Sequence, residues 1–193
     1  DPFTLNLDVA ALSGKITRRT KAVIPVHIAG LPCDMQGILA AASSHGLAVV
    51  EDAAHAFPSS YRGQPIGSVG DITCFSFYAT KTLTTGEGGM ATTNNQAWAE
   101  RMRRMTLHGI TKDAWKRYSD SGSWYYEIGA PGYKYNLTDI AAAIGIEQLR
   151  KCQRLLEARR RIAAAYECGF ADLPELRLPS AGAEAEHSWH LYV

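Results

Sequence analysis

Short apolar runs alternate with segments of helical periodicity along most of the chain. Runs with the length and composition of strands occur at residues 21–27, 47–51, 71–77 and 86–93, the last of which begins in a glycine-rich turn. Strands that are apolar throughout and alternate with helices are typical of a parallel sheet covered on both faces. The pattern therefore predicts an α/β fold with a mostly parallel sheet flanked by helices.

Capping residues and apolar periodicity predict two short helices. The first begins at Asp34 and ends near Gly46, since aspartate favours the N-cap position and glycine the position after a helix. The second begins after Asn94 or Asn95. Each of these helices follows a predicted strand, as the alternating pattern requires.

A much longer helix is predicted to begin at Thr138 and Asp139 and to continue through about Phe170. Residues 110–135 are predicted to form a long surface loop, because they are polar, aromatic and rich in glycine. One face of the long helix is expected to contain Ile140, Ile144, Cys152, Leu156, Ala163 and Tyr166.

Two other segments contain the residues that usually interrupt regular structure. Residues 57–70 carry several glycines and prolines and are predicted to be a loop. Residues 173–187 contain Pro174, Pro179 and Gly182 and are predicted to be a linker.

Composition narrows the function classes. The chain has 193 residues, of which 46% are hydrophobic and 20% are charged, with a net charge of +1. Such a balance excludes disorder over most of the chain and offers no broad charged field for nucleic acid or an anionic membrane. No apolar run approaches the ~20 residues that cross a bilayer, so no membrane insertion is expected. The cysteines are scattered without a CxxC pair, which favours a reduced, cytoplasmic compartment.

The chain begins at Asp1 and ends at Val193 within an apolar stretch, whereas natural termini are more often polar. We therefore expect it to be a piece of a longer protein.

Polar residues with catalytic potential follow two of the predicted strands. Asp52 stands where the second strand ends, and His55 follows it. Ligands of open α/β sheets bind at such strand ends, although Asp52 could equally cap a following helix. Lys81 follows the third strand among small and apolar residues, where reduced solvation would lower its pKa and free the amine to attack carbonyls. The alternative for Lys81 is an ordinary surface lysine.

Other motifs are weaker. The glycines at 86–89 lack the ending of a phosphate-binding P-loop, so a tight turn is the simpler interpretation. His187 and His190 are three residues apart, but further ligands are missing and no metal site is predicted. An aspartate, a flat histidine ring, a hydroxyl group and a sheltered lysine together suit pyridoxal phosphate.

Four long stretches resemble the DegT/DnrJ/EryC1/StrS family of nucleotide-sugar aminotransferases, and they occur in the order of that family. The stretches are PVHIAGLPCDM, VVEDAAHAFPSSYRG, GDITCFSFYATKTLTTGEGGM and PGYKYNLTDIAAAIGIEQL. Within the family, DAWKRY, PGYKYNLTDI and SWHLYV are most similar to the enzymes that form UDP-4-amino-4-deoxy-L-arabinose.

The resemblance implies a role for each matching residue. Lys81 would form the Schiff base with pyridoxal 5'-phosphate, and Asp52 would pair with the nitrogen of its pyridine ring. His55 would stack on that ring, where many relatives have glutamine. Ser76 would bind the cofactor phosphate, and Asn136 would reach the phosphate of the neighbouring subunit's cofactor.

The family also implies a fold and partners. The fold would be the large domain of a fold type I transferase, with residues 1–172 in that domain and residues 173–193 forming a linker and the start of a small C-terminal domain. The protein would be a homodimer with shared active sites that takes an amino group from glutamate or glutamine. The acceptor would be a keto sugar nucleotide for cell-surface polysaccharide, lipid A (lipopolysaccharide) or antibiotic sugars, which His190 would touch.

The sequence departs from the family in what it lacks. An upstream phosphate-binding turn and most of the small domain are absent, so the piece alone is expected to be inactive. Relatives that dehydrate sugars have histidine in place of the Schiff-base lysine, so Lys81 favours amino transfer. Two alternatives stay open, namely a truncated, dimerising pseudoenzyme and an aldolase-like enzyme that uses Lys81 without a cofactor. The Asp52 and His55 pairing argues against the second, which has no pyridine ring to protonate.

Overall fold

The computed structural model describes residues 1–110, 126–180 and 182–193. Most of the loop predicted at 110–135 therefore lies outside the described residues. In chain order the elements are α1 (Val9–Leu12), a 3-10 helix (Ser13–Lys15), β1 (Ala22–Val23), a second 3-10 helix (Ile28–Gly30), α2 (Met35–Ser44), β2 (Ala48–Asp52), β3 (Ser60–Tyr61), β4 (Gln64–Pro65), β5 (Ile72–Ser76), β6 (Gly89–Thr92), α3 (Gln96–Met105), α4 (Asp139–Phe170) and β7 (Ala185–Glu186).

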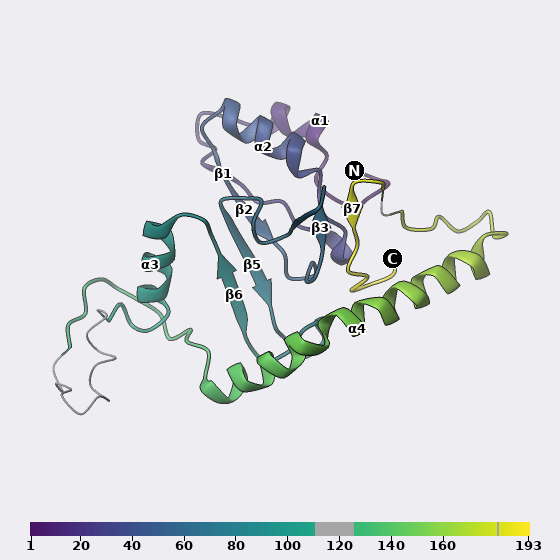
Figure 1. Ribbon diagram of the computed structural model, residues 1–193. Coiled ribbons are helices and arrows are strands. Elements are labelled where there is room, and N and C mark those ends of the chain that lie inside the picture. Colours follow the sequence, from purple (N-terminus) through teal and green to yellow (C-terminus); the bar gives the residue numbers. More distant parts are fainter. Residues whose placement is uncertain (111–125, 181) are drawn as a thin grey trace.

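The main sheet has the order β1-β2-β5-β6, and Figure 1 shows its strands side by side. Strands β1, β2 and β5 are parallel, whereas β6 runs antiparallel to β5. A parallel return needs a crossover connection, and no helix intervenes between β5 and β6. The prediction of one mostly parallel sheet is confirmed, and all four predicted strands belong to it.

The first predicted strand, 21–27, is regular only over β1. Pro25 has no N–H group for the ladder, so pairing stops there and resumes only at Val26, which forms a bridge to Asp52. The edge of the sheet beside the end of β2 is therefore an irregular segment.

Helix α2 lies against the sheet as its sequence predicts. The carboxylate of Asp34 accepts a hydrogen bond from the N–H of Gly37 at 3.1 Å, and Gly46 follows the helix with φ of +62°. The buried side chains of the helix pack with those of β1 and β2 in the main core. These core residues include Met35, Ile38, Ala42, Val23 and Val49.

Side-chain caps also set the starts of the other two long helices. Asn95 accepts a hydrogen bond from the N–H of Trp98 at 3.1 Å, which begins α3. Thr138 accepts one from the N–H of Ala141 at 3.3 Å, which begins α4. Both boundaries agree with the sequence prediction.

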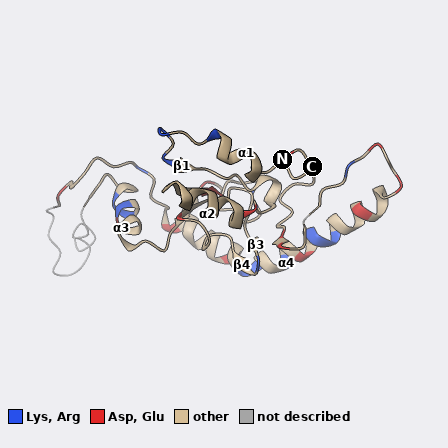
Figure 2. Ribbon diagram, turned by 90° about the horizontal axis from the view of Figure 1, so that it is seen from above, with Lys and Arg blue, Asp and Glu red and all other residues tan. Residues whose placement is uncertain are grey.

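Helix α4 has 32 residues and is about 48 Å long. Figure 1 shows it passing the carboxyl end of β5 and continuing beyond the sheet. Of the predicted apolar face only Leu156 and Ala163 are buried, whereas Ile140 is 78% exposed. Figure 2 shows residues of both charges along the same helix. No helix in the described ranges is long and apolar enough to cross a membrane.

The segment at 57–70, predicted as a loop, contains a short hairpin. Strands β3 and β4 pair across Arg62 and Gly63, which both have positive φ, as a tight two-residue hairpin turn requires. Strand β7 then pairs with the other side of β3, so this second sheet has the order β4-β3-β7. The end of the segment 173–187, predicted to be a linker, thus forms a strand. It does so because its backbone pairs with the edge of β3, which is distant in the sequence.

A buried carboxylate joins three parts of the main sheet. Oε2 of Glu51 lies 2.9 Å from Nε2 of His27, and both residues are 0% exposed. Oε1 accepts hydrogen bonds from the hydroxyl of Thr73 at 2.6 Å and from the N–H of Gly70 at 2.8 Å. A Cβ at Gly70 would lie 2.7 Å from Oε1, so glycine is required beside this carboxylate.

The hydrogen bonds fix the protonation of the pair. The N–H of Cys33 donates to Nδ1 of His27 at 3.0 Å, so Nδ1 is an acceptor and Nε2 carries the proton of a neutral ring. That proton points at Glu51, which therefore accepts from every partner and must be ionised. Burial alone would raise the pKa of Glu51, but the bonds from His27, Thr73 and Gly70 outweigh it and lower the pKa.

We expect Glu51→Gln in the full-length protein to lower the free energy of unfolding by about 1–3 kcal/mol, because the amide places an NH₂ group against a buried donor. The folded pKa of Glu51 is lowered, so its contribution is complete above about pH 4.3 and is lost as the pH falls through the folded pKa. Denaturant unfolding at a series of pH values measures both effects.

The control is Glu147→Gln, at a 57% exposed side chain that pairs with Arg150 on α4. It should change stability by no more than about 0.5 kcal/mol. Equal stability of Glu51→Gln and wild type at neutral pH would contradict the prediction.

Candidate functional site

The carboxyl ends of β2 and β5 lie side by side, because these strands pair in parallel. Asp52 is the last residue of β2 and stands opposite Cys74 of β5, while Ser76 ends β5. Side chains that leave the sheet here share one edge, which is where ligands bind in open α/β sheets.

Backbone hydrogen bonds hold Asp52 in place, and its carboxylate can accept further hydrogen bonds. Its N–H donates to the carbonyl of Pro25 at 2.9 Å, and its carbonyl accepts from the N–H of His27 at 3.1 Å. Oδ1 accepts a hydrogen bond from the N–H of Ala54 at 3.0 Å. Turns follow Asp52, so it does not cap a helix, and Oδ2 has no hydrogen bond among the described residues.

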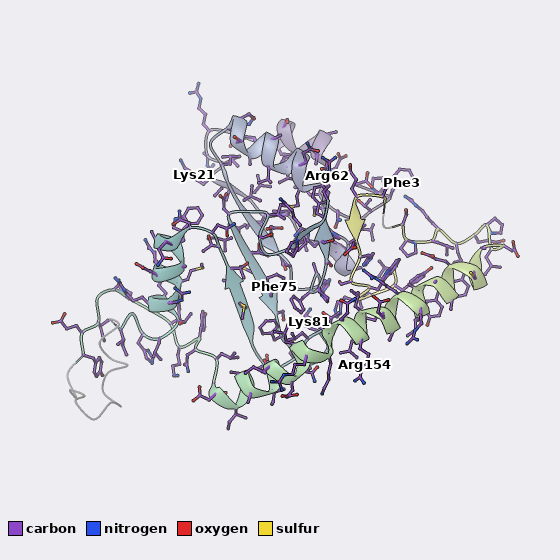
Figure 3. All side chains as sticks on the ribbon, in the orientation of Figure 1. Phe3, Lys21, Arg62, Phe75, Lys81 and Arg154 are labelled. Atoms are coloured by element: carbon purple, nitrogen blue, oxygen red, sulfur yellow. The ribbon has the colours of Figure 1, made fainter. Side chains whose placement is uncertain are left out.

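Lys81 lies in the turn after β5, and Figure 3 shows it just beyond the end of that strand. Its N–H donates to the carbonyl of Tyr78 at 2.9 Å, which sets the turn. The side chain is half-buried, and no ion pair or hydrogen bond within the described ranges involves its Nζ. The amine is therefore available to a ligand.

The ring of His55 lies within reach of both charged groups. Burial lowers the pKa of His55, the positive charge of Lys81 lowers it further, and the negative charge of Asp52 raises it. Nδ1 of His55 is buried and has no hydrogen-bond partner within the described part of the chain. A lysine and a carboxylate that follow neighbouring strands thus both act on one flat ring.

A second histidine packs against this ring. The ring centroids of His55 and His190 are 4.6 Å apart, with planes tilted by 42°. Burial, together with His55, Lys81 and Arg159, lowers the pKa of His190 to about 4. Nδ1 of His190 is likewise buried, and no described residue forms a hydrogen bond with it. In the described residues, no three His, Cys, Asp or Glu side chains are grouped to hold a metal ion.

Hydrogen bonds hold the segment that contains His190 against the residues around His55 and against α4. The hydroxyl of Ser188 donates to the carbonyl of His55 at 2.9 Å, and the N–H of Ser188 donates to the carbonyl of Gly30 at 3.1 Å. A Cβ at Gly30, where φ is +101°, would lie 2.1 Å from the Ser188 hydroxyl oxygen. The guanidinium of Arg159 on α4 donates to the carbonyls of Trp189 and His190 at 3.0 and 3.2 Å.

The remaining two residues named from the sequence are Ser76, which ends β5, and Asn136, which precedes α4. The hydroxyl of Ser76 accepts a hydrogen bond from the N–H of Tyr78 at 3.3 Å, at the start of the turn that contains Lys81. Asn136 accepts a hydrogen bond from the ammonium of Lys134. Asn136 lines an open cavity of about 510 Å³ whose other walls are Thr85, Glu87, Gly88, Gly89, Tyr135, Leu137, Thr138, Ile140, Ala141 and Ile144. The structure thus gathers Asp52, His55, Lys81 and His190, whereas Asn136 lines an open cavity whose walls include none of these four residues.

Sequence reasoning missed the residues that support the site. Ser188 and Arg159 position His190 by donating hydrogen bonds to the backbone carbonyls of His55 and Trp189. Such contacts with the backbone leave no motif in the sequence. His27 and Glu51 form a buried pair, and Glu51 directly precedes Asp52 in the chain. The one signal in the sequence is that Glu51 is two residues after Val49, so both side chains point to the buried face of β2. A carboxylate at a buried position needs hydrogen-bond donors around it.

NMR of the histidine ring nitrogens in the full-length protein can measure how Lys81 and Asp52 change the pKa values of His55 and His190. Lys81→Ala removes a nearby positive charge, so the pKa of both His55 and His190 should rise. Asp52→Asn removes a negative charge, so the pKa of His55 should fall. The matched control is Lys151→Ala, at an exposed lysine of α4, which should leave both pKa values unchanged. A His55 pKa that is the same in all variants would show that these groups do not share a site.

Comparison with known proteins identifies the family. The chain matches the DegT/DnrJ/EryC1/StrS aminotransferase family over residues 1–193. It is 51% identical over 193 residues to the Spore coat polysaccharide biosynthesis protein SpsC of Bacillus subtilis (strain 168), which covers all of this chain and 50% of SpsC. The chain thus spans about half the length of the curated relatives it matches.

Solved structures agree. The putative sugar aminotransferase Spr1654 from Streptococcus pneumoniae, in its PMP-form, superposes with a TM-score of 0.90 at 36% identity, over 100% of this chain and 53% of that one. Helicobacter pylori PseC, an aminotransferase involved in the biosynthesis of pseudoaminic acid, superposes with a TM-score of 0.89 at 30% identity, over 97% of this chain and 48% of that one. With the sheet order and the strand-end residues described above, these matches show that the chain belongs to the DegT/DnrJ/EryC1/StrS aminotransferase family.

Proposed function

We propose that the chain supplies the catalytic lysine and the ring-binding side of the active site in a pyridoxal-phosphate-dependent aminotransferase. The protein transfers an amino group from glutamate or glutamine to the keto group of a nucleotide-linked sugar. The observation that carries the proposal is the placement of Asp52 and Lys81 after neighbouring parallel strands, with both charges near enough to His55 to act on its ring. Membership of a sugar aminotransferase family supports the reaction class.

The residues at this edge of the sheet suit pyridoxal phosphate. The cofactor requires an amine for its carbonyl, an anion for its ring nitrogen, a flat surface for its ring and donors for its phosphate. Among the residues that the structure describes, the amine of Lys81 has no partner, one oxygen of Asp52 has no hydrogen bond, and one ring nitrogen of His55 is unpaired. Another Spr1654 structure is described as its PLP-form, and it covers 97% of this chain.

When bound, the cofactor supplies an electron-poor ring that accepts the electron pair released at a substrate carbon. Lys81 would hold the cofactor through its amine, and the same amine would move the proton at the substrate carbon as a general base. Asp52 keeps the ring nitrogen protonated through its carboxylate. These roles explain why a lysine and an aspartate are needed at the same edge without direct contact between them.

The other named residues take positions around these two. His55 stacks on the ring, Ser76 donates its hydroxyl to the cofactor phosphate, and His190 contacts the substrate. Asn136 reaches the cofactor phosphate of the second subunit in a homodimer, which accounts for its place in a separate, open cavity. Residues 1–172 are the corresponding part of the large domain, and residues 173–193 lead into the small domain.

The substrate is a keto sugar linked to a nucleotide. SpsC is named for spore coat polysaccharide biosynthesis and PseC for pseudoaminic acid biosynthesis. We propose a cytoplasmic reaction that serves cell-surface polysaccharide, lipopolysaccharide or antibiotic sugar synthesis. The UDP-linked 4-keto pentose that yields UDP-4-amino-4-deoxy-L-arabinose is the first acceptor to assay.

A dimerising pseudoenzyme of the same fold is the competing function. Visible absorbance after addition of pyridoxal phosphate to the full-length protein separates the two. An enzyme should bind the cofactor through Lys81 and turn over, whereas a pseudoenzyme should dimerise without turnover.

Substitutions at the strand ends test the roles directly in the full-length protein. Lys81→Ala should reduce amino transfer by at least about 10³-fold, because it removes the proton-transfer base as well as the attachment point. Asp52→Asn should reduce kcat by about 10²–10³-fold, because an amide cannot hold the ring nitrogen protonated. Chromatography of the aminated sugar nucleotide measures turnover, and circular dichroism checks that the fold is kept.

His55→Gln is the internal comparison for these variants. A flat amide still covers the ring, so turnover should stay within about tenfold of wild type, since no charge-bearing role is lost. Near-normal turnover of Asp52→Asn would refute the role given to Asp52. A thousandfold loss in His55→Gln would show that His55 transfers a proton.

A further inference from the structure

We propose that the buried pair of His27 and Glu51 is a positioning device for Asp52, which sets the place of its carboxylate relative to the cofactor ring. The inference rests on the proposed function. In this role His27 and Glu51 touch neither the cofactor nor the substrate, and they act through the backbone at the end of β2.

The pair of His27 and Glu51 lies beside an interruption in the main sheet. The regular ladder between β1 and β2 ends at Val23, and Pro25 has no N–H with which to extend it. On this side, the pairing of β2 is therefore interrupted between Val49 and Asp52, where the single bridge to Val26 restores it. The bond from His27 to Glu51, at 2.9 Å, joins the two segments beside this isolated bridge.

His27 and β5 also hold the backbone of Asp52. The N–H of His27 donates to the Asp52 carbonyl at 3.1 Å, while the ring of His27 binds the side chain of the preceding residue. On the other side, Thr73 of β5 binds Glu51 and lies one residue before Cys74, the ladder partner of Asp52. Residues 51 and 52 are thus fixed from both neighbouring strands.

The alternation of side chains along a strand couples the direction of Asp52 to that of Glu51. Successive side chains of a strand point to opposite faces, so a buried Glu51 aims Asp52 the other way. A rotation of β2 that let Glu51 leave its donors would turn Asp52 away from its present direction. Because the donors of His27, Thr73 and Gly70 converge on one carboxylate, such a rotation is strongly opposed.

The chemistry of the pair allows little substitution. His27 is locked as the Nε2-protonated tautomer by the N–H of Cys33, so its proton always faces residue 51. A glutamine at 51 can present its oxygen to His27 or to the pair of Thr73 and Gly70, but its NH₂ group then faces a donor. The strand end must shift to relieve that conflict, and Asp52 shifts with it.

The experiment uses the full-length protein loaded with pyridoxal phosphate labelled with ¹⁵N in its ring. The ¹⁵N chemical shift reports the protonation of the ring nitrogen, independently of turnover. In Glu51→Gln the shift should move toward that of an unprotonated ring, and kcat should fall about 10- to 100-fold, as a small misplacement can cause. The KM for the amino donor should change little.

Thr73→Val is a milder second variant, which removes one donor and should change the ¹⁵N shift and kcat in the same direction by less. Val49→Ala is the matched control, because Val49 is 1% exposed and shares the face and strand of Glu51. It should lower stability through lost packing while leaving the ¹⁵N shift and kcat unchanged.

The outcomes separate the two proposals. If the wild-type protein fails to bind pyridoxal phosphate or holds an unprotonated ring, the proposed function fails and this inference falls with it. If the wild-type ring is protonated and remains equally protonated in both Glu51→Gln and Thr73→Val, the positioning role alone is overturned. It is also overturned if Val49→Ala changes the ¹⁵N shift as much as Glu51→Gln does.

Discussion

The buried carboxylate of Glu51 is the interaction on which the order of the main sheet depends. An ionised carboxylate out of contact with water is tolerated only if its oxygens are fully hydrogen-bonded. Here the donors come from the segment after β1, from β5 and from the loop that precedes β5. The same need for donors therefore specifies which segments must lie on each side of β2, and it requires a glycine at position 70.

The electrostatics at the strand ends differ from those of this buried pair. Burial, rather than any single charge, is the main cause that lowers the pKa of His55 and His190. Lys81 and Asp52 act on the His55 ring with opposite sign and partly offset each other. The strand ends thus present an amine and a carboxylate beside one flat ring, and these are the groups that pyridoxal phosphate would meet if bound as proposed.

The sequence predicts the parts of the fold that depend on local interactions. Asp34, Asn95 and Thr138 cap their helices as expected, because an N-cap bond involves residues only three positions apart. The strands of the main sheet follow from apolar runs of the right length. Strand β1 is shorter than predicted, and Pro25 supplies the reason.

What could not be predicted depends on contacts between distant segments. Strand β3 is stabilised by β7, more than a hundred residues later, so a stretch rich in glycine and proline gave no indication of a sheet. The partnership of His27 with Glu51 is likewise invisible in the sequence, since an apolar run does not reveal which strand is its neighbour. For the site, strand-end position and family resemblance named Asp52 and Lys81, whereas the supporting contacts of Ser188 and Arg159 needed the structure.

The fastening of the C-terminal segment also affects when the site can form. Ser188 binds the carbonyl of His55 across 133 residues of sequence, and Gly30 accepts from the same residue. During synthesis, Asp52 and Lys81 leave the ribosome well before Ser188 does. The surroundings of His55 are therefore completed only after residues 188–190 have been made, and until then its ring lacks the contact with His190 and its backbone carbonyl lacks the hydrogen bond from Ser188.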